Sequence, residues 1–338
     1  MITKFQVTRA IGVIKLCTTI VQSFSLIVNS GFHSSIVNPA YGSQNTAFSE
    51  KRPASLFRAG DIDFTDVKLI FSDMDGTLLL PSHRISERSI HAISAVKAKG
   101  IPFLPATGRN RPSMLAAVGP QFLQLFGDSI EHIPGIFSQG LVVYGMDGKL
   151  IHQEFLPYSI VMEVENFCRE NSLSMIAYSG DTIYTTEYNN YTLGIMKYND
   201  IKPELVPQSL LQLDTKAIPL NKLIILSEDP LISKHRPELE KHLVGKASFT
   251  SAVKGMLEVL PFGASKGKGV QKFLEYHDVD RRHVMAFGDA ENDLEMIKLV
   301  KYGIAMENAR DDLFHHAYRR TLSNRENGVA YILEHVVA

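Results

Sequence analysis

The sequence predicts an α/β protein in which a doubly wound, parallel-sheet core carries a smaller, inserted α+β domain. Three short apolar runs, at residues 67–71, 101–104 and 283–287, each lead into an acidic or glycine-containing stretch. A helical pattern separates the first two runs, and a right-handed strand–helix–strand unit of this length builds a parallel sheet. The stretch at about 147–257 instead mixes strand-like alternation with helical runs. We therefore expect an insert between two halves of one parallel domain.

The composition predicts a folded chain with room for more than one domain. The chain has 338 residues, of which 45% are hydrophobic and 21% are charged. These values exclude a disordered chain, a disulfide scaffold and a coiled-coil or collagen-like rod. The two cysteines, Cys17 and Cys168, lie in different segments, so no internal disulfide is expected if the first segment is removed. Cys168 is expected to be a small buried apolar residue.

Residues 1–65 are expected to form a targeting or disordered leader outside the fold. Residues 1–60 hold six Lys or Arg and one acid, Glu50, and their apolar stretch at 20–28 is interrupted by polar residues. That stretch is too short and too polar to span a bilayer. The layout fits a secretory signal, a plastid or mitochondrial transit peptide, or both in succession. A disordered extension of a cytoplasmic protein also fits, and the sequence does not name the compartment or the cleavage point.

The remainder of the chain is acidic, which argues against one class of partner. Residues 61–338 hold 29 basic and 35 acidic residues, a net charge of −6. A negative net charge disfavours non-specific binding to nucleic acid. We therefore expect no nucleic-acid partner and no stable membrane span, and the oligomeric state stays open.

The first half of the core is expected to run strand, helix, strand. The strand at 67–71 leads to Asp73 and Asp75. A helix follows between Ser86, whose hydroxyl can cap a helix N-terminus, and Gly100, which suits a helix end. The strand at 101–104 then leads to Thr107. Reactive groups of open α/β sheets lie at the carboxyl ends of the strands, so these strand ends are expected to share one site.

The second half of the core repeats this order, with a strand at 283–287, a helix at 294–300 and a strand at 302–306. In the insert, strand-like patterns lie at 174–184, 222–226 and 255–259, and helical patterns at 159–170 and 237–243. We predict a leader at 1–65, a core at 66–146 and 258–338, and an inserted domain at 147–257.

Acidic residues at two strand ends predict a metal site. Alternate residues at the end of a strand, such as Asp73 and Asp75, can face one site, and two carboxylates there repel each other unless a cation or a shared proton intervenes. Asp289 and Asp293 add carboxylates after the third strand. Mg²⁺ is the expected ion, because it is a hard cation that takes a few carboxylates and keeps several waters. Gly76 permits the sharp turn that brings the backbone close.

Two further stretches have the chemistry of a phosphate site. Thr107 and Gly108 place a hydroxyl and free backbone N–H groups at a strand-to-helix turn, where anions bind. Lys266 supplies a positive charge for phosphoryl oxygens.

The four motifs together resemble those of the haloacid dehalogenase (HAD) superfamily. They run in order along the chain as Asp73-x-Asp75-Gly76-Thr77, Thr107, Lys266 and Gly288-Asp289-x-x-Asn292-Asp293. The resemblance covers the chain from about 67 to 333 and implies a Rossmann-like core. The alternative, in which these carboxylates only cap helices, does not explain all four motifs in matching strand contexts.

The spacing of the motifs is similar to one branch of that superfamily. Asp73 and Thr107 are 34 residues apart, which leaves no room for a cap domain between them. Thr107 and Lys266 are 159 residues apart, which is room for a C2-type cap. That layout is similar to the Cof-type branch, mostly sugar-phosphate phosphatases. Two departures stand out: Ser138-Gln139-Gly140 replaces the usual Ser-Asn-Gly, and Pro105 replaces a more usual apolar residue.

The resemblance implies a role for each site residue. Asp73 is the expected nucleophile, which forms an aspartyl-phosphate, and Asp75 the expected general acid and base. The expected phosphate-binding residues are Thr107, Gly108, Lys266 and Asn292. The expected magnesium ligands are Asp73, Asp75 through its backbone carbonyl, Asp289 and Asp293.

The resemblance predicts a phosphatase that acts on a small phosphate monoester, with a sugar phosphate as the leading candidate. The second aspartate argues against dehalogenation, because attack on carbon leaves no alkoxide to protonate. A phosphotransferase or phosphomutase is one alternative, although the familiar mutases carry their cap between the first two motifs. A regulatory protein that binds a phosphometabolite on the same fold is the other alternative.

Overall fold

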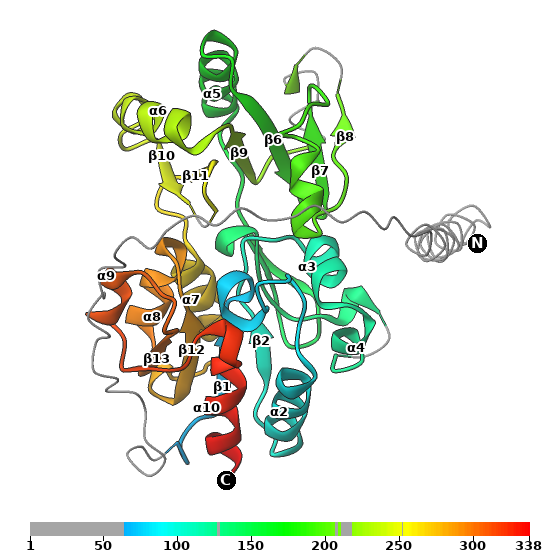
Figure 1. Ribbon diagram of the computed structural model, residues 1–338, viewed down its shortest axis with the longest axis vertical. Helices are drawn as coiled ribbons and strands as arrows, with labels where there is room; N and C mark the ends of the chain where they lie inside the picture. Colours follow the sequence, from blue (N-terminus) through cyan, green and yellow to red (C-terminus); the bar gives the residue numbers. More distant parts are fainter. Residues whose placement is uncertain (1–63, 127–128, 207–208, 211–217, 252) are drawn as a thin grey trace, which may run out of the picture. The chain divides into compact units, whose positions relative to one another are not determined.

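The structure is a computed structural model that describes residues 64–126, 129–206, 209–210, 218–251 and 253–338 (Figure 1). The predicted leader at 1–65 lies outside the described residues except for its last two positions. No helix in the described ranges is both long and apolar enough to cross a membrane.

A five-stranded parallel sheet, here called the core sheet, forms the centre of the core. Its order is β14-β13-β12-β1-β2, and all four pairings are parallel. The strands are β1 Leu69–Ser72, β2 Phe103–Pro105, β12 Val284–Gly288, β13 Tyr302–Ala305 and β14 Arg319–Arg320. The predicted parallel α/β core is confirmed, because the predicted runs became β1, β2, β12 and β13.

Helices cover both faces of the core sheet. Along β1, Ile70 packs with α2 and α10, while its neighbour Phe71 points to the other face and packs with α7 and α8. The side chain of Ser86 accepts a hydrogen bond from the N–H of Ser89 and starts α2, as predicted. The core helices are α2 Glu87–Ala98, α3 Arg111–Val118, α4 Pro120–Leu123, α7 Lys266–Tyr276, α8 Leu294–Leu299, α9 Asp311–Phe314 and α10 Gly328–Val337.

A small antiparallel sheet extends the core beyond β2. It contains β3 Gly135–Phe137, β4 Val142–Tyr144 and β5 Leu150–Gln153, and a parallel bridge between Ala106 and Ile136 joins it to the end of β2. The predicted boundary between residues 146 and 147 falls before β5. Because β5 pairs with β4, the chain leaves the core only after Gln153.

The inserted stretch folds into a six-stranded sheet, here called the inserted sheet, in the order β10-β11-β9-β6-β7-β8. Helices α5 and α6 pack against one face through a cluster that includes Cys168, which is buried as predicted. The opposite face carries Tyr178 and Ile224. The elements are α5 Tyr158–Glu170, β6 Ser174–Ser179, β7 Thr182–Thr185, β8 Glu204–Leu205, β9 Lys222–Leu226, α6 Asp229–His242, β10 Ala247–Thr250 and β11 Met256–Pro261.

Two details of the insert differ from the sequence prediction. The run at 174–184 is a hairpin of β6 and β7, because Gly180 turns the chain with a φ of 53°. Helix α6 begins at Asp229 rather than 237. Pro230 occupies its first turn, where a missing N–H costs nothing, and Pro237 lies inside the helix.

Candidate functional site

The carboxyl ends of β1 and β12 bring three of the predicted metal ligands together. One carboxylate oxygen from each of Asp73, Asp289 and Asp293 lies within 4.8 Å of the others. Asp73 is fixed where β1 meets β12, since its N–H donates to the carbonyl of Phe287 at 3.0 Å. The spacing of parallel strands therefore gathers carboxylates from distant parts of the chain.

Lys266 is the cation of this cluster. It is fully buried as the first residue of α7, whose N-terminus is capped by Ser265. Its Nζ bonds Asp73 Oδ1 and lies 2.7 Å from Asp293 Oδ1. Burial alone would lower the pKa of Lys266, but Asp293 and Asp73 outweigh it and raise the pKa. The lysine therefore remains charged between two carboxylates.

The carboxylates carry more negative charge than Lys266 offsets. Burial, followed by repulsion from Asp293, raises the pKa of Asp73 well above its usual range. The same two causes raise the pKa of Asp289 to about 7. A shared proton or a cation bound among these carboxylates would relieve the repulsion that contributes to both shifts.

The loop geometry fits a divalent ion. Asp293 Oδ2 accepts the N–H groups of Asp289 and Ala290, both at 3.0 Å, which fixes the loop after β12. A Cβ on Gly76 would lie 2.3 Å from Asp289 Oδ2, so only glycine lets this turn approach the carboxylate. The three carboxylates are oxygen donors of the kind that suit Mg²⁺.

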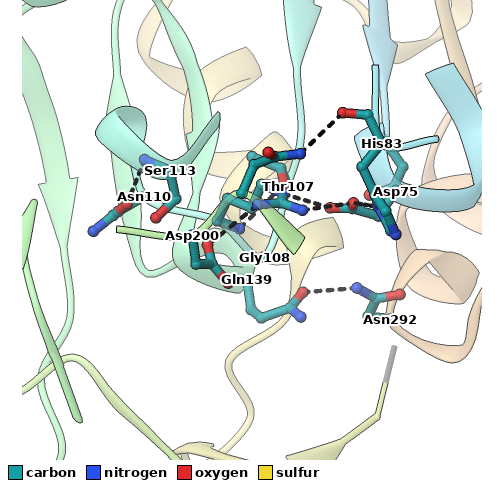
Figure 2. Close-up of polar contacts among 12 residues, drawn as sticks. Asp75, His83, Thr107, Gly108, Asn110, Ser113, Gln139, Asp200 and Asn292 are labelled. Carbon is teal, nitrogen blue, oxygen red and sulfur yellow. Dashed lines mark hydrogen bonds and ion pairs between the residues drawn. The ribbon is translucent and has the colours of Figure 1, made fainter. Parts of the chain in front are cut away.

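The Asp75 side chain is held by Arg109 and His83. Its two oxygens accept from Arg109 Nε at 2.6 Å and Nη2 at 2.8 Å, and His83 Nδ1 lies 3.3 Å from Oδ1. Burial would raise the pKa of Asp75, but the hydrogen bonds from Arg109 and then His83 outweigh it and hold the pKa well below its usual range. Asp75 is therefore ionised in this arrangement, and Figure 2 shows it beside His83.

Three of the predicted phosphate-binding residues, Thr107, Gly108 and Asn292, lie after the ends of β2 and β12, and the fourth, Lys266, begins α7. The hydroxyl of Thr107 accepts the N–H of Arg109 at 3.1 Å. A Cβ on Gly108 would lie 2.6 Å from Gln139 Nε2, so the close approach of that side chain requires glycine. Asn292 Nδ2 donates to Gln139 Oε1 at 3.0 Å, while its own Oδ1 is buried and has no hydrogen-bond partner among the described residues.

A cavity of about 70 Å³ lies between these strand ends and the face of the inserted sheet that is opposite to α5 and α6. Of the predicted site residues, Asp73, Asp75, Gly108 and Asn292 line it. Thr107, Lys266, Asp289 and Asp293 are not among its lining residues. From the inserted stretch, the lining residues are Tyr178, Tyr198, Asp200, Lys222, Ile224, Val253, Met256 and Glu258.

Several residues around the cavity were not predicted as site residues. Arg109 bonds Asp75 and also reaches Asp200, with Nη1 3.2 Å from Oδ1. Lys222 and Glu258 form a buried ion pair on adjacent strands. A charged residue inside an expected buried strand was the available signal, because burial of a lone charge is costly and implies a partner.

Comparison with known proteins agrees with the motifs. A family model of haloacid dehalogenase-like hydrolases matches residues 70–333. The chain is 31% identical over 312 residues to the chloroplastic endoribonuclease YBEY of Arabidopsis thaliana, covering 90% of this chain and 53% of that protein. The chain thus spans about half the length of this relative.

Two other similar proteins are matched over most of their length. The HMP-PP phosphatase of Escherichia coli O6:H1 is 27% identical over 249 residues, covering 73% of this chain and 86% of that protein. A solved structure from Plasmodium vivax, described as a HAD/COF-like hydrolase, has a TM-score of 0.73 at 28% identity. It covers 80% of this chain and 96% of that chain.

Proposed function

This chain belongs to the haloacid dehalogenase-like hydrolases and is a phosphatase, and we propose that it hydrolyses a small phosphate monoester with the help of Mg²⁺. A sugar phosphate is the first candidate substrate. The observation that carries the proposal is the cluster of Asp73, Lys266 and Asp293, with Asp289 within 4.8 Å of both aspartates. This cluster joins a nucleophile, a cation and a metal site at one point.

Asp73 is the proposed nucleophile. One of its carboxylate oxygens attacks phosphorus, the bond from phosphorus to the leaving oxygen breaks, and an aspartyl-phosphate forms. Water then attacks the same phosphorus, and the bond to Asp73 breaks. Asp73, Asp289, Asp293 and the Asp75 carbonyl would hold Mg²⁺, which would supply positive charge to stabilise the phosphoryl oxygens.

Asp75 is the proposed general acid and base. It gives a proton to the leaving oxygen in the first step and takes one from water in the second. In the present arrangement Arg109 keeps it ionised, so Arg109 must loosen its hold before the first step. Asp200 Oδ1 already lies 3.2 Å from Arg109 Nη1. We propose that Arg109 keeps this ion pair with Asp200 when it releases Asp75.

The remaining proposed site residues hold the phosphoryl group. Lys266 offsets the negative charge of Asp73 and of the oxygens that it attacks. Thr107 contributes its hydroxyl, Gly108 its backbone N–H and Asn292 its amide. Thr107, Gly108 and Asn292 follow the core strands β2 and β12, and Lys266 begins α7.

The small volume of the cavity supports the proposal that the inserted sheet is a cap that moves. Ligand pockets usually measure about 300 to 1,000 Å³, far more than the 70 Å³ found here. We propose that the inserted sheet moves away from the core to admit substrate and returns to exclude water. The hinges would lie after Gln153 and near Pro261, which keeps the predicted division into core and cap with its first boundary shifted.

The leader is proposed to direct the protein to an organelle. The early residues are basic and poor in acids, and the Arabidopsis relative is named chloroplastic. A fusion of residues 1–65 to a fluorescent protein tests this proposal. Diffuse cytoplasmic fluorescence would contradict it.

Phosphate release from the full chain tests the proposed function. The panel holds an aryl phosphate, several sugar phosphates and HMP-PP, each with Mg²⁺ and with a chelator. Release that requires Mg²⁺ and disappears in Asp73→Asn supports the proposal. The matched control is Asp147→Asn, since Asp147 is exposed and pairs only with Lys149 among the described ion pairs.

The same assay separates the alternatives. A phosphotransferase or mutase would move the phosphoryl group to an added sugar acceptor in preference to water. A regulatory protein would bind a phosphate ester without releasing phosphate. Either result would overturn the proposed hydrolysis.

A further inference from the structure

We propose that Gln139 is a positioning residue that couples the placement of the inserted sheet to the groups that hold the phosphoryl moiety. The inference rests on the proposed function, since it assigns Asn292 and Gly108 to phosphate binding. It concerns a residue at which the chain departs from the Ser-Asn-Gly pattern of similar proteins.

The side chain of Gln139 joins the two sides of the cavity. Its Oε1 accepts from Asn292 Nδ2 at 3.0 Å, and its Nε2 donates to Glu258 Oε1 at 2.5 Å. Asn292 belongs to the loop after β12, whereas Glu258 lies on β11 of the inserted sheet. Gln139 itself is only 1% exposed, and Figure 2 shows its amide directed at Asn292.

The connection continues through an ion pair to the other phosphate-binding turn. The second oxygen of Glu258 bonds Lys222 Nζ, and Lys222 Nζ also donates to the carbonyl of Gly108 at 2.8 Å. Gly108 and Asn292 are thus tied to the same pair of charged residues. A buried pair of this kind is retained at low cost only when each charge has further hydrogen-bond partners, and Gln139 and Gly108 supply them.

The backbone of Gln139 cannot shift to compensate for a shorter side chain. Its φ of 62° is in the left-handed region, and its N–H donates to the carbonyl of Thr107 at 3.1 Å. On the next residue, Gly140, a Cβ would lie 2.1 Å from the carbonyl of Ser265, so the turn is pressed against the start of α7. Asparagine, one methylene shorter, would lose at least one of the two amide contacts.

The orientation of the Asn292 amide depends on its hydrogen bond to Gln139. In the part of the chain that the structure describes, its Oδ1 is buried without a partner, so the bond from Nδ2 to Gln139 sets its orientation. The second hydrogen of Nδ2 remains available for a phosphoryl oxygen. When the inserted sheet moves away with Glu258, Gln139 loses one of its two anchors, and Asn292 loses its fixed orientation.

The test measures binding of inorganic phosphate to the full chain by calorimetry, with Mg²⁺ present. We expect Gln139→Asn to weaken binding about 10-fold, the loss of roughly one hydrogen bond to a buried polar group. Asn292→Ala should weaken it as well. Adding Gln139→Asn to Asn292→Ala should then cause almost no further loss, because both changes remove the same contact.

An exchange of charge distinguishes positioning from mere packing. Gln139→Glu alone should weaken phosphate binding, because a carboxylate would face Glu258. The double variant Gln139→Glu/Glu258→Gln should recover binding to within about 3-fold of wild type, since the donor and acceptor have changed places and Lys222 keeps an anion nearby. A structural role alone predicts no such recovery.

The outcomes separate this inference from the function on which it rests. Wild-type protein that neither binds nor releases phosphate would overturn both. Wild-type activity together with unchanged binding in Gln139→Asn, fully additive losses with Asn292→Ala, or no recovery in the exchanged pair would overturn the role of Gln139 alone.

Discussion

The core edge of the cavity and the facing side of the inserted sheet are built on different principles. On the core side, Lys266 contacts both Asp73 and Asp293, and all three residues are almost completely buried. In the inserted stretch, Asp200 in the loop before β8 contacts Arg109 of the core, and Lys222 on β9 contacts Gly108 of the core. Core elements alone, the ends of β1 and β12 and the start of α7, position the first set. The second set is complete only while the inserted sheet lies against the core.

The largest effect is expected from breaking the core cluster. Lys266→Met leaves two buried carboxylates without their cation, so unfolding free energy should fall by about 3 to 5 kcal/mol. Phosphatase activity should drop more than about 1,000-fold, because the variant loses electrostatic stabilisation at the reacting phosphorus. Urea unfolding and phosphate release measure the two losses.

The neighbouring lysine provides the control for that change. Lys268 lies two residues later in the same helix and is exposed. Lys268→Met should change neither stability nor activity by a comparable amount. Equal losses in the two variants would show that the helix, rather than the Lys266 cluster, had been disturbed.

Metal binding should distinguish the core side of the cavity from the inserted sheet, because all the proposed side-chain ligands belong to the core. Mg²⁺ at about 100 times its dissociation constant should stabilise the chain by about 2.7 kcal/mol. The carboxylate cluster predicts that Asp289→Asn reduces this gain strongly. Thermal unfolding with Mg²⁺ and with a chelator measures it, and an undiminished gain in the variant would place the ion elsewhere.

Arg109 tests the junction between the two regions through pH. The pKa of Asp75 is held low in the folded chain, so its pairing stabilises the fold above the ordinary carboxyl range and is lost as pH falls through the lowered pKa. Arg109→Met should therefore cost about 1 to 3 kcal/mol at pH 7, and the difference from wild type should shrink below about pH 4.

The exposed Arg84 is the matched control for Arg109. The only described hydrogen bond of its side chain is a long one, 3.4 Å, from Nη1 to the carbonyl of Ala116. Denaturant unfolding of Arg84→Met should show a small loss with little dependence on pH. A loss for Arg109→Met that stayed constant down to pH 3 would contradict the role of the Asp75 pair.

The smallest effect concerns the helix-covered face of the inserted sheet. Burial, with a lesser contribution from Glu165, raises the pKa of Cys168 to about 12. In a Cys17→Ser background, Cys168 should not react with a thiol reagent until the chain unfolds. Rapid labelling of the native protein would mean that α5 opens far more readily than its packing indicates.

The difference between the core side and the inserted sheet also explains which site residues the sequence could predict. Asp73 and Asp289 follow short buried strands, so parallel pairing alone predicts their meeting. The pairing of Lys222 with Glu258 depends on the register of β9 and β11, which opposes Glu258 to Ile224, and the sequence does not specify that register.

Arg109 illustrates a second limit. Its sequence position is compatible equally with a place near the site and with an exposed charge. Its actual contact with Asp75 depends on the turn at Met74–Leu78, where Asp75 and Gly76 have non-helical backbone angles that the residue types do not specify. The contacts of Gln139 with Asn292 and Glu258 likewise depend on a left-handed backbone conformation that its residue type does not predict.

The central claim is that Asp73 carries the phosphoryl group during hydrolysis. Its most direct test is mass spectrometry of the full chain, acid-quenched during turnover of an aryl phosphate with Mg²⁺. We predict that the peptide containing Asp73 gains the mass of one phosphoryl group, and that Asp73→Asn shows no gain. Steady phosphate release without any labelled peptide, or a label on another residue, would contradict the claim.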